Sequence, residues 1–233
     1  MGRAEVLADV VQMVEDAGSG VLVGVDGVDG AGKTVFADAL GDALRGAGLH
    51  VVRVSVDGFH RPRVERYRRG ARSPEGFFLD SYDYDALRRE VLDPFAPGGD
   101  RRYRGAIRDV ASDEAVEEPQ RTAPADAVLV VDGIFLHRDE LAGVWDVSLF
   151  LDVPFGETFA RMARRDGCPA DPADERNRRY VEGQRLYLAA CDPAARATLV
   201  IDNTDPAHPR VTTTRARPEQ ARSSDAADDL TAF

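Results

Sequence analysis

A glycine-rich run that ends in lysine and threonine is the part of this chain most suited to chemistry. It reads Gly-Val-Asp-Gly-Ala-Gly-Lys-Thr and contains Lys33, the only lysine among 233 residues. The run fits G-x-x-x-x-G-K-[ST], in which backbone N–H groups surround the phosphates of a nucleotide. Lys33 would reach the β- and γ-phosphates, and the Thr34 hydroxyl would hold Mg²⁺. We therefore expect ATP or GTP to bind at Gly27, Val28, Asp29, Gly30, Ala31, Gly32, Lys33 and Thr34.

Acidic residues follow three apolar segments of the sequence. Asp57, Asp132 and Asp152 lie at or just after the ends of runs rich in valine and leucine. Ligands of open α/β sheets bind at the carboxyl ends of the strands, so Asp57 and Asp132 are candidate site residues. Each could act on a substrate or on Mg²⁺, or it could simply cap the helix that follows.

These residues must be positioned by an alternation of strands and helices. The apolar segments are short, as expected for parallel strands buried on both faces, and stretches of helical periodicity separate them. We predict a three-layer α/β sandwich with a five-stranded parallel sheet. The expected strands are 21–26, 50–56, 127–132, 146–152 and 198–202, and the expected helices are 3–17, 33–46, 83–93, 154–165 and 175–190.

Three stretches depart from this alternation. Residues 58–82 and 95–126 are polar or arginine-rich and are candidate substrate-binding insertions, the second with a hairpin around 101–110. From residue 204 onward large apolar residues are scarce, which predicts a disordered tail over 204–233. The domain that binds the nucleotide is accordingly expected over residues 1–203.

Composition excludes several classes of protein. A net charge of −11 argues against a general nucleic-acid binder. No apolar run approaches the length of a membrane span and no signal peptide is recognisable, so we expect no membrane partner and a cytoplasmic location. The two cysteines fit a reducing compartment. An ordinary GTPase is excluded because its Asn-Lys-x-Asp motif needs a second lysine. The oligomeric state stays open, a homo-oligomer included.

Four motifs together resemble the uridine kinase-like branch of phosphate-loop kinases, which also contains phosphoribulokinase, pantothenate kinase and nicotinamide riboside kinase. The resemblance covers roughly residues 20–203. It implies the P-loop NTPase kinase fold, Mg²⁺ and ATP as cofactors, and a small-molecule hydroxyl as phosphoryl acceptor. The motifs are Gly27–Thr34, Val54-Ser55-Val56-Asp57-Gly58-Phe59-His60, Ser81-Tyr82-Asp83 and Val131-Asp132-Gly133-Ile134.

The resemblance also implies roles for single residues. Asp57 matches the acid that accepts the proton of the acceptor hydroxyl, with Lys33 on the phosphates. Asp132 stands where uridine kinases have glutamate and would act on Mg²⁺ with Thr34, its shorter side chain favouring contact through water. Asp83 matches an acid that binds ribose hydroxyls, although it is equally well placed as a helix cap. The expected acceptor contacts are Phe59, His60, Asp83, Tyr103 and His137, with an ordinary loop or core role left open for the histidines and Tyr103.

Arginines form two further candidate groups. Arg161 and Arg165 are four residues apart and share a helix face. In the related kinases this helix leads into a lid, so both are expected to stabilise the transferring phosphoryl group. Six arginines between residues 61 and 72 would suit an acceptor that already carries phosphate, or would simply balance the acidic remainder.

The acceptor is the open part of this interpretation. The preferred reaction is transfer of the γ-phosphate of ATP to the 5′-hydroxyl of uridine or cytidine. A phosphosugar, pantothenate or nicotinamide riboside is the alternative acceptor. The alternative from another class is a non-catalytic regulator that binds ATP.

Overall fold

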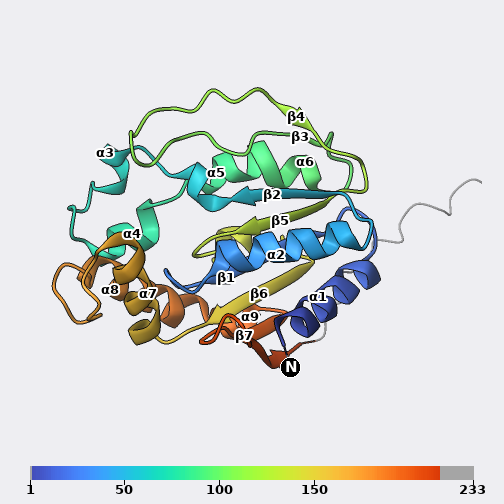
Figure 1. Cartoon of the computed structure of the whole chain (residues 1–233). Coiled ribbons are helices and arrows are strands. Elements are labelled where there is room, and N and C mark those ends of the chain that lie inside the picture. The colour runs from blue at the N-terminus through green and yellow to red at the C-terminus, as the bar shows by residue number, and fades with distance from the viewer. Residues whose placement is uncertain (1, 216–233) are drawn as a thin grey trace, which may run out of the picture.

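The chain is built around one six-stranded sheet, seen in a computed structural model that describes residues 2–215 (Figure 1). The strand order is β2-β5-β1-β6-β7-β8. Neighbours among the first five strands are parallel, which confirms the five predicted strands, and β8 pairs antiparallel with β7. The strands are β1 (Leu22–Gly27), β2 (Val51–Ser55), β5 (Val128–Asp132), β6 (Val147–Asp152), β7 (Leu199–Asp202) and β8 (Arg210–Thr214).

The register of the central strands brings their carboxyl ends to one level. Asp132 at the end of β5 lies opposite Val25 of β1 and opposite Ser55 of β2. The segments that leave these strands therefore start side by side. Strands β1 and β5 are buried along their whole length, as their valine-rich sequences predict.

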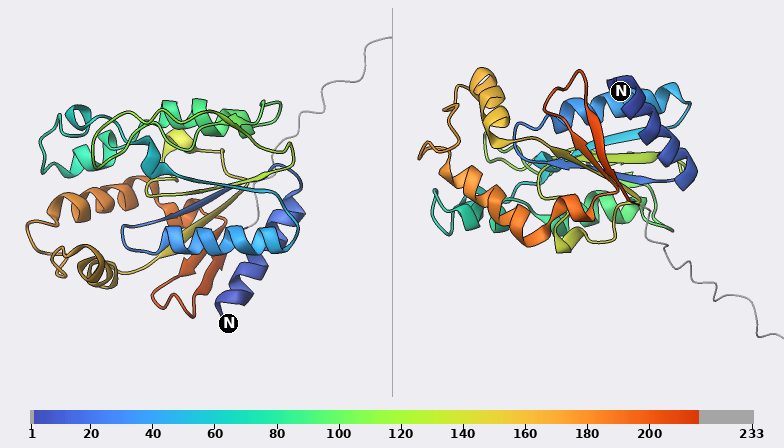
Figure 2. Two further views of the ribbon diagram at one scale, coloured as in Figure 1. Left: turned by 45° about the horizontal axis from the view of Figure 1, so that its top comes forward. Right: turned by 90° about the horizontal axis from the view of Figure 1, so that it is seen from below.

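Helices α1 (Arg3–Ala17) and α2 (Lys33–Gly46) cover one face of the sheet (Figure 2). Val10, Phe36 and Leu40 are each at most 2% exposed and pack with Val23 and Val25 of β1. Their spacing at helical period is the reason these two segments form amphipathic helices.

The opposite face carries the segment from α5 (Tyr84–Leu87) to α6 (Asp93–Phe95) and the helix α8 (Arg178–Cys191). Leu87, Val91 and Tyr187 form a second core there with Val54 and Leu129. The sheet thus lies between two helical layers, as predicted. None of the helices within the described residues is both long and apolar enough to cross a membrane.

The predicted helix 83–93 is interrupted by a wide turn. It runs as α5 (Tyr84–Leu87), a π-helical stretch η2 (Arg88–Leu92) and α6 (Asp93–Phe95). Pro94 lacks an N–H and its ring would clash with the carbonyl of Glu90 in a regular α-helix. That carbonyl instead accepts a hydrogen bond of 3.1 Å from Arg104 N.

The remaining helical elements complete the fold. They are η1 (Val56–Phe59), α3 (Arg63–Arg66), α4 (Pro74–Asp80), η3 (Asp139–Leu141), α7 (Phe155–Asp166) and α9 (Pro193–Arg196). Helices α3 and α4 lie within the first expected insertion, and α4 packs on α8.

Two expectations about the polar segments need correction. The hairpin expected around 101–110 is instead a ribbon between β3 (Arg102–Tyr103) and β4 (Arg121–Thr122), which are distant in sequence. The prediction of a disordered tail from residue 204 is wrong for Arg210–Thr214. These residues, mostly threonine and valine, form β8, which extends the sheet at its edge. Residues 216–233 of the expected tail lie outside the described residues.

Candidate active site

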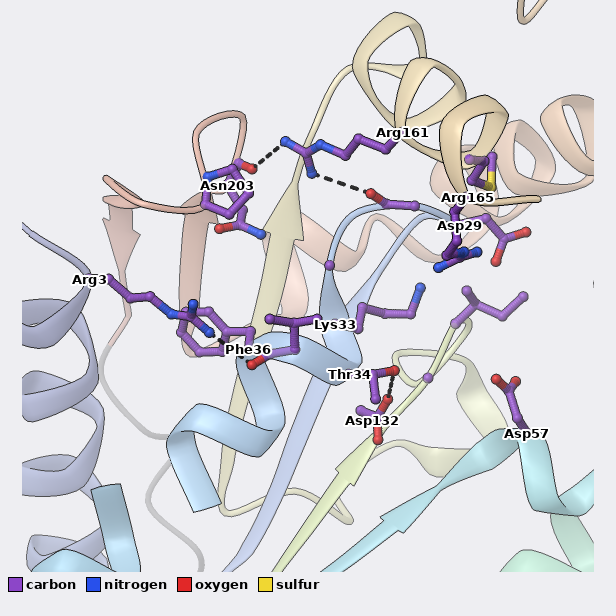
Figure 3. Close-up of a pocket in the computed structure, with 17 residues that line it drawn as sticks. Arg3, Asp29, Lys33, Thr34, Phe36, Asp57, Asp132, Arg161, Arg165 and Asn203 are labelled. Carbon is purple, nitrogen blue, oxygen red and sulfur yellow. Dashed lines mark hydrogen bonds between the residues drawn. The ribbon is translucent and has the colours of Figure 1, made fainter. Parts of the chain in front are cut away.

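A cavity of about 330 Å³ lies at the carboxyl ends of β1, β2 and β5 (Figure 3). Its walls come from the loop after β1, from η1, from the end of β5, from α7 and from the loop after β7. The cavity brings together seven of the predicted site residues other than glycines: Asp29, Lys33, Thr34, Asp57, Asp132, Arg161 and Arg165.

The glycine-rich loop connects β1 to α2 and wraps around the amino end of that helix. Gly30 and Gly32 have φ angles of 76° and 90°, a left-handed conformation that glycine adopts without strain. A Cβ on Gly30 would lie 2.6 Å from the carbonyl oxygen of Thr158, so this position also needs glycine for close packing against α7. Lys33 starts α2 and its Nζ donates to the Val28 carbonyl at 2.9 Å. The loop therefore offers backbone N–H groups, a helix amino end and one ammonium group to an anion.

Thr34 and Asp132 meet below this loop. The Thr34 hydroxyl donates to Asp132 Oδ2 at 2.8 Å, and the Asp132 side chain is 3% exposed. Its other oxygen, Oδ1, accepts a hydrogen bond of 2.9 Å from Arg53 of β2. The same guanidinium contacts Asp38 of α2 at 3.0 Å. Hydroxyl and carboxylate oxygens are the ligands that Mg²⁺ prefers, so this pair fits the ion, with both carboxylate oxygens already hydrogen-bonded.

Asp57 occupies the side of the cavity nearest to η1. The Tyr82 hydroxyl donates to Asp57 Oδ1 at 3.0 Å, and the backbone N–H of Asp57 donates to Ser55 Oγ at 3.3 Å. Burial and the negative charge of Asp57 raise the pKa of Tyr82 well above its ordinary value, so the phenol stays a donor. The motif around Tyr82 was visible in the sequence, but its contact with Asp57 was not foreseen.

Asp29 places a third carboxylate in the cavity, beside Asp57 and Asp132. The sequence predicted this residue only as part of the phosphate-binding loop. Burial raises the pKa of Asp29, the charge of Asp57 raises it further, and Lys33 and Arg165 oppose the shift. Its backbone N–H donates to Gln184 Oε1 of α8 at 2.5 Å. An acid inside the glycine-rich run was the signal that could have indicated this group.

Arg161 connects the phosphate loop to the loop after β7. Its guanidinium donates to the carbonyl oxygens of Gly30 at 3.3 Å, Asn203 at 2.9 Å and Thr204 at 2.8 Å. The Asn203 amide makes a parallel contact with the carbonyl of Ala31 at 2.7 Å. Arg161 was expected on the transferring phosphoryl group, and here it holds two backbone segments together. Asn203 was missed because nothing in the sequence pairs it with the distant loop.

The sequence was compared with curated proteins and with solved structures. No model of a known protein family matches it. Thymidylate kinase of Xylella fastidiosa (strain M12) is 35% identical over 155 residues, which are 64% of this chain and 66% of that protein. The chain thus spans just under two thirds of that relative's length.

Two solved structures share the architecture described above. A protein described as a possible uridine kinase from Bacillus stearothermophilus is 23% identical, with a TM-score of 0.58 over 77% of this chain and 87% of that one. A candidate fructose transport system kinase from Silicibacter sp. TM1040 is 25% identical, with a TM-score of 0.59 over 76% and 93%. This protein has the fold of a phosphate-loop kinase.

Three of the predicted acceptor residues do not line the cavity. His137 has a side chain 4% exposed, and its Nδ1 lies 2.7 Å from Asp26 Oδ2 in β1. Phe59 is fully buried in the core. Tyr103 is half-buried and its ring packs edge-on against Phe95, with centroids 5.6 Å apart. The structure therefore places these three residues away from the cavity, in the packing roles left open for His137 and Tyr103.

Asp83 and His60 do not line the cavity. Asp83 Oδ1 accepts a hydrogen bond of 2.9 Å from the N–H of Ala86, so this acid caps α5 as the alternative interpretation predicted. His60 Nδ1 lies 2.8 Å from the carbonyl oxygen of Asp57, and its ring is 4.5 Å from that of Tyr82. Burial lowers the pKa of His60, so the imidazole is neutral near pH 7.

The arginine-rich segment is largely paired within the fold. Arg68 and Arg69 contact the two oxygens of Asp80 at 2.5 and 2.9 Å, and Asp80 is 2% exposed. Arg66 contacts Asp113 at 3.1 Å. These contacts favour the second of the two interpretations, in which the segment balances acidic residues.

Proposed function

We propose that this protein is an ATP-dependent kinase that transfers the γ-phosphate to a hydroxyl group of a small metabolite. The observation that carries the proposal is the convergence of Lys33, Thr34, Asp132 and Asp57 in one cavity beside the phosphate loop. Phosphoryl transfer needs cations on the phosphates, a place for Mg²⁺ and a group that orients the attacking hydroxyl. The cavity offers a residue for each of these tasks.

The donor phosphates would lie against the loop amides and the amino end of α2. Lys33 Nζ donates to the Val28 carbonyl, a partner that it can exchange for a phosphate oxygen. Thr34 and Asp132 would hold Mg²⁺, with Asp132 acting through water because both its oxygens are occupied. The ion would supply positive charge that stabilises the charge developing on the phosphoryl oxygens.

The acceptor hydroxyl would approach from the side of Asp57. Asp57 would accept its proton, and the Tyr82 hydrogen bond fixes the orientation of the carboxylate. We propose the 5′-hydroxyl of uridine or cytidine as the acceptor. The pairing of Arg66, Arg68 and Arg69 with carboxylates supports an unphosphorylated acceptor.

ADP release from Mg·ATP in the presence of single acceptors tests this proposal. The acceptors are uridine, cytidine, thymidylate, pantothenate, nicotinamide riboside, D-glycerate, fructose and a phosphosugar. Each is run with the wild type, with Asp57→Asn, and with Asp42→Asn as a matched control on the exposed side of α2, where the Asp42 side chain is 80% exposed. We expect turnover with uridine or cytidine that is lost in Asp57→Asn and kept in Asp42→Asn.

Other outcomes separate the alternatives. Turnover only with a phosphorylated acceptor would support the kinase activity and contradict a nucleoside as the acceptor. Tight ATP binding without turnover on any acceptor would instead support a non-catalytic ATP-binding regulator.

A further inference from the structure

Arg3, the first residue of α1, lines the same cavity although it lies outside every motif discussed above. Its guanidinium donates to the carbonyl oxygen of Val35, in the first turn of α2, at 2.8 Å. Its Nε–H is buried and has no hydrogen-bond partner among the described residues. A buried donor without a partner is unfavourable, and a ligand that offers an acceptor atom there would satisfy it.

Arg3 and Asp57 lie at opposite ends of the cavity, with Lys33 and Thr34 between them (Figure 3). The γ-phosphate must face the acceptor hydroxyl, which on the proposed function lies at Asp57. A nucleoside triphosphate bound at Lys33 therefore extends its nucleoside half toward the other end. Arg3 shares that end with Asn203 of the loop after β7.

We propose that Arg3 binds the nucleoside half of the phosphoryl donor, with its guanidinium against the base. An arginine side chain offers only hydrogen-bond donors and a flat cationic face. Nucleobases match both properties, because their ring nitrogens are acceptors and their faces attract cations. The hydrogen bond to Val35 holds the guanidinium in place before the nucleotide arrives, so little side-chain freedom is lost on binding. This inference rests on the proposed function, since it concerns the donor of that reaction.

Calorimetric titration with two ligands tests the assignment. ATP carries a base, whereas inorganic tripolyphosphate carries only the phosphates, and both are titrated with Mg²⁺ present. We expect Arg3→Ala to weaken ATP binding about tenfold, the value of one such contact, and to leave tripolyphosphate binding unchanged. Arg3→Lys keeps the charge but loses the flat face, so it should weaken ATP binding by a smaller factor.

Arg45→Ala is the matched control, because Arg45 lies at the far end of α2 with Asp42 as its partner. It should alter neither titration. Thermal unfolding of each variant checks that α1 stays packed, and Arg3→Lys carries the test if Arg3→Ala does not fold. Equal weakening of ATP and tripolyphosphate, or no change in ATP binding, would overturn the role of Arg3 alone. Failure of the wild type to bind either ligand would overturn the proposed function and this inference with it.

Discussion

The Tyr82 hydroxyl donates a hydrogen bond of 3.0 Å to Asp57 Oδ1, and this contact joins the insertion after β2 to the candidate catalytic acid. Tyr82 is 4% exposed, and its position is fixed by a backbone bridge between His60 and Tyr82. Asp57 itself follows a strand end on a short helical turn, which alone allows several side-chain orientations. The orientation of the candidate base is thus set by a residue that lies 25 positions further along the chain.

Tyr82→Phe should lower kcat about tenfold and leave the KM for ATP unchanged, because it removes one hydrogen bond to a charged group. Steady-state kinetics with the acceptor found in the ADP-release assay measures this. Tyr84→Phe is the control, since the hydroxyl of the nearby Tyr84 donates to the Phe135 carbonyl at 3.4 Å and not to Asp57. An equal loss in both variants would point to a general packing effect.

Arg53→Gln should weaken Mg²⁺-dependent ATP binding about tenfold, as expected when a residue that orients a metal-site carboxylate is lost. Arg53 holds Asp132 Oδ1 at 2.9 Å, and without it Asp132 is free to leave Thr34. Calorimetry with ATP in the presence of Mg²⁺ and of EDTA measures the difference, which should disappear in EDTA. Asp38→Asn removes only the exposed partner of the same guanidinium and should keep the wild-type Mg²⁺ effect.

The loop, strands and central helices could be predicted because their signals are local. Apolar runs, helical periodicity and the run from Gly27 to Thr34 each occupy consecutive residues, and their structure follows from them. The edge strand β8 was missed because its residues are mostly threonine and only partly buried, so they do not form a clear apolar run. Its pairing with β7 is a tertiary contact that composition does not reveal.

The site was only partly predictable for the same reason. Arg53 lies inside an otherwise valine-rich strand, and a charged residue in such a strand needs a partner. The sequence shows this requirement, but the partner, Asp132, lies 79 residues further along the chain. His137 was predicted to contact the acceptor because it follows β5 in the sequence. In the structure its side chain is buried against Asp26 instead. Motif position indicates which segment reaches the cavity. Side-chain direction within that segment depends on packing against distant elements.

Asp29→Asn should stabilise the protein more at pH 7 than at pH 4. Burial raises the pKa of Asp29 above its ordinary 3.8, so the folded state holds this proton more tightly than the unfolded chain does. The contribution of protonated Asp29 to the free energy of unfolding is fully present below pH 3.8, and it is lost as the pH rises through the folded-state pKa. Urea unfolding of the nucleotide-free protein from pH 4 to pH 7 measures the effect. The exposed Asp42→Asn should follow the wild-type pH dependence, and parallel curves for Asp29→Asn and wild type would contradict the assignment.

Arg161→Gln should lower the free energy of unfolding by about 2 kcal/mol, since it removes hydrogen bonds from a charged group to backbone carbonyls. It should also weaken the binding of ATP and tripolyphosphate together, because Gly30 of the phosphate loop loses its tie to the loop after β7. Arg164→Gln, an exposed position on the same helix, is the control for both measurements. Urea unfolding and calorimetric titration separate this positioning role from the one first expected. A variant with unchanged stability and binding but a much reduced kcat would instead support the role first expected for Arg161, stabilising the transferring phosphoryl group.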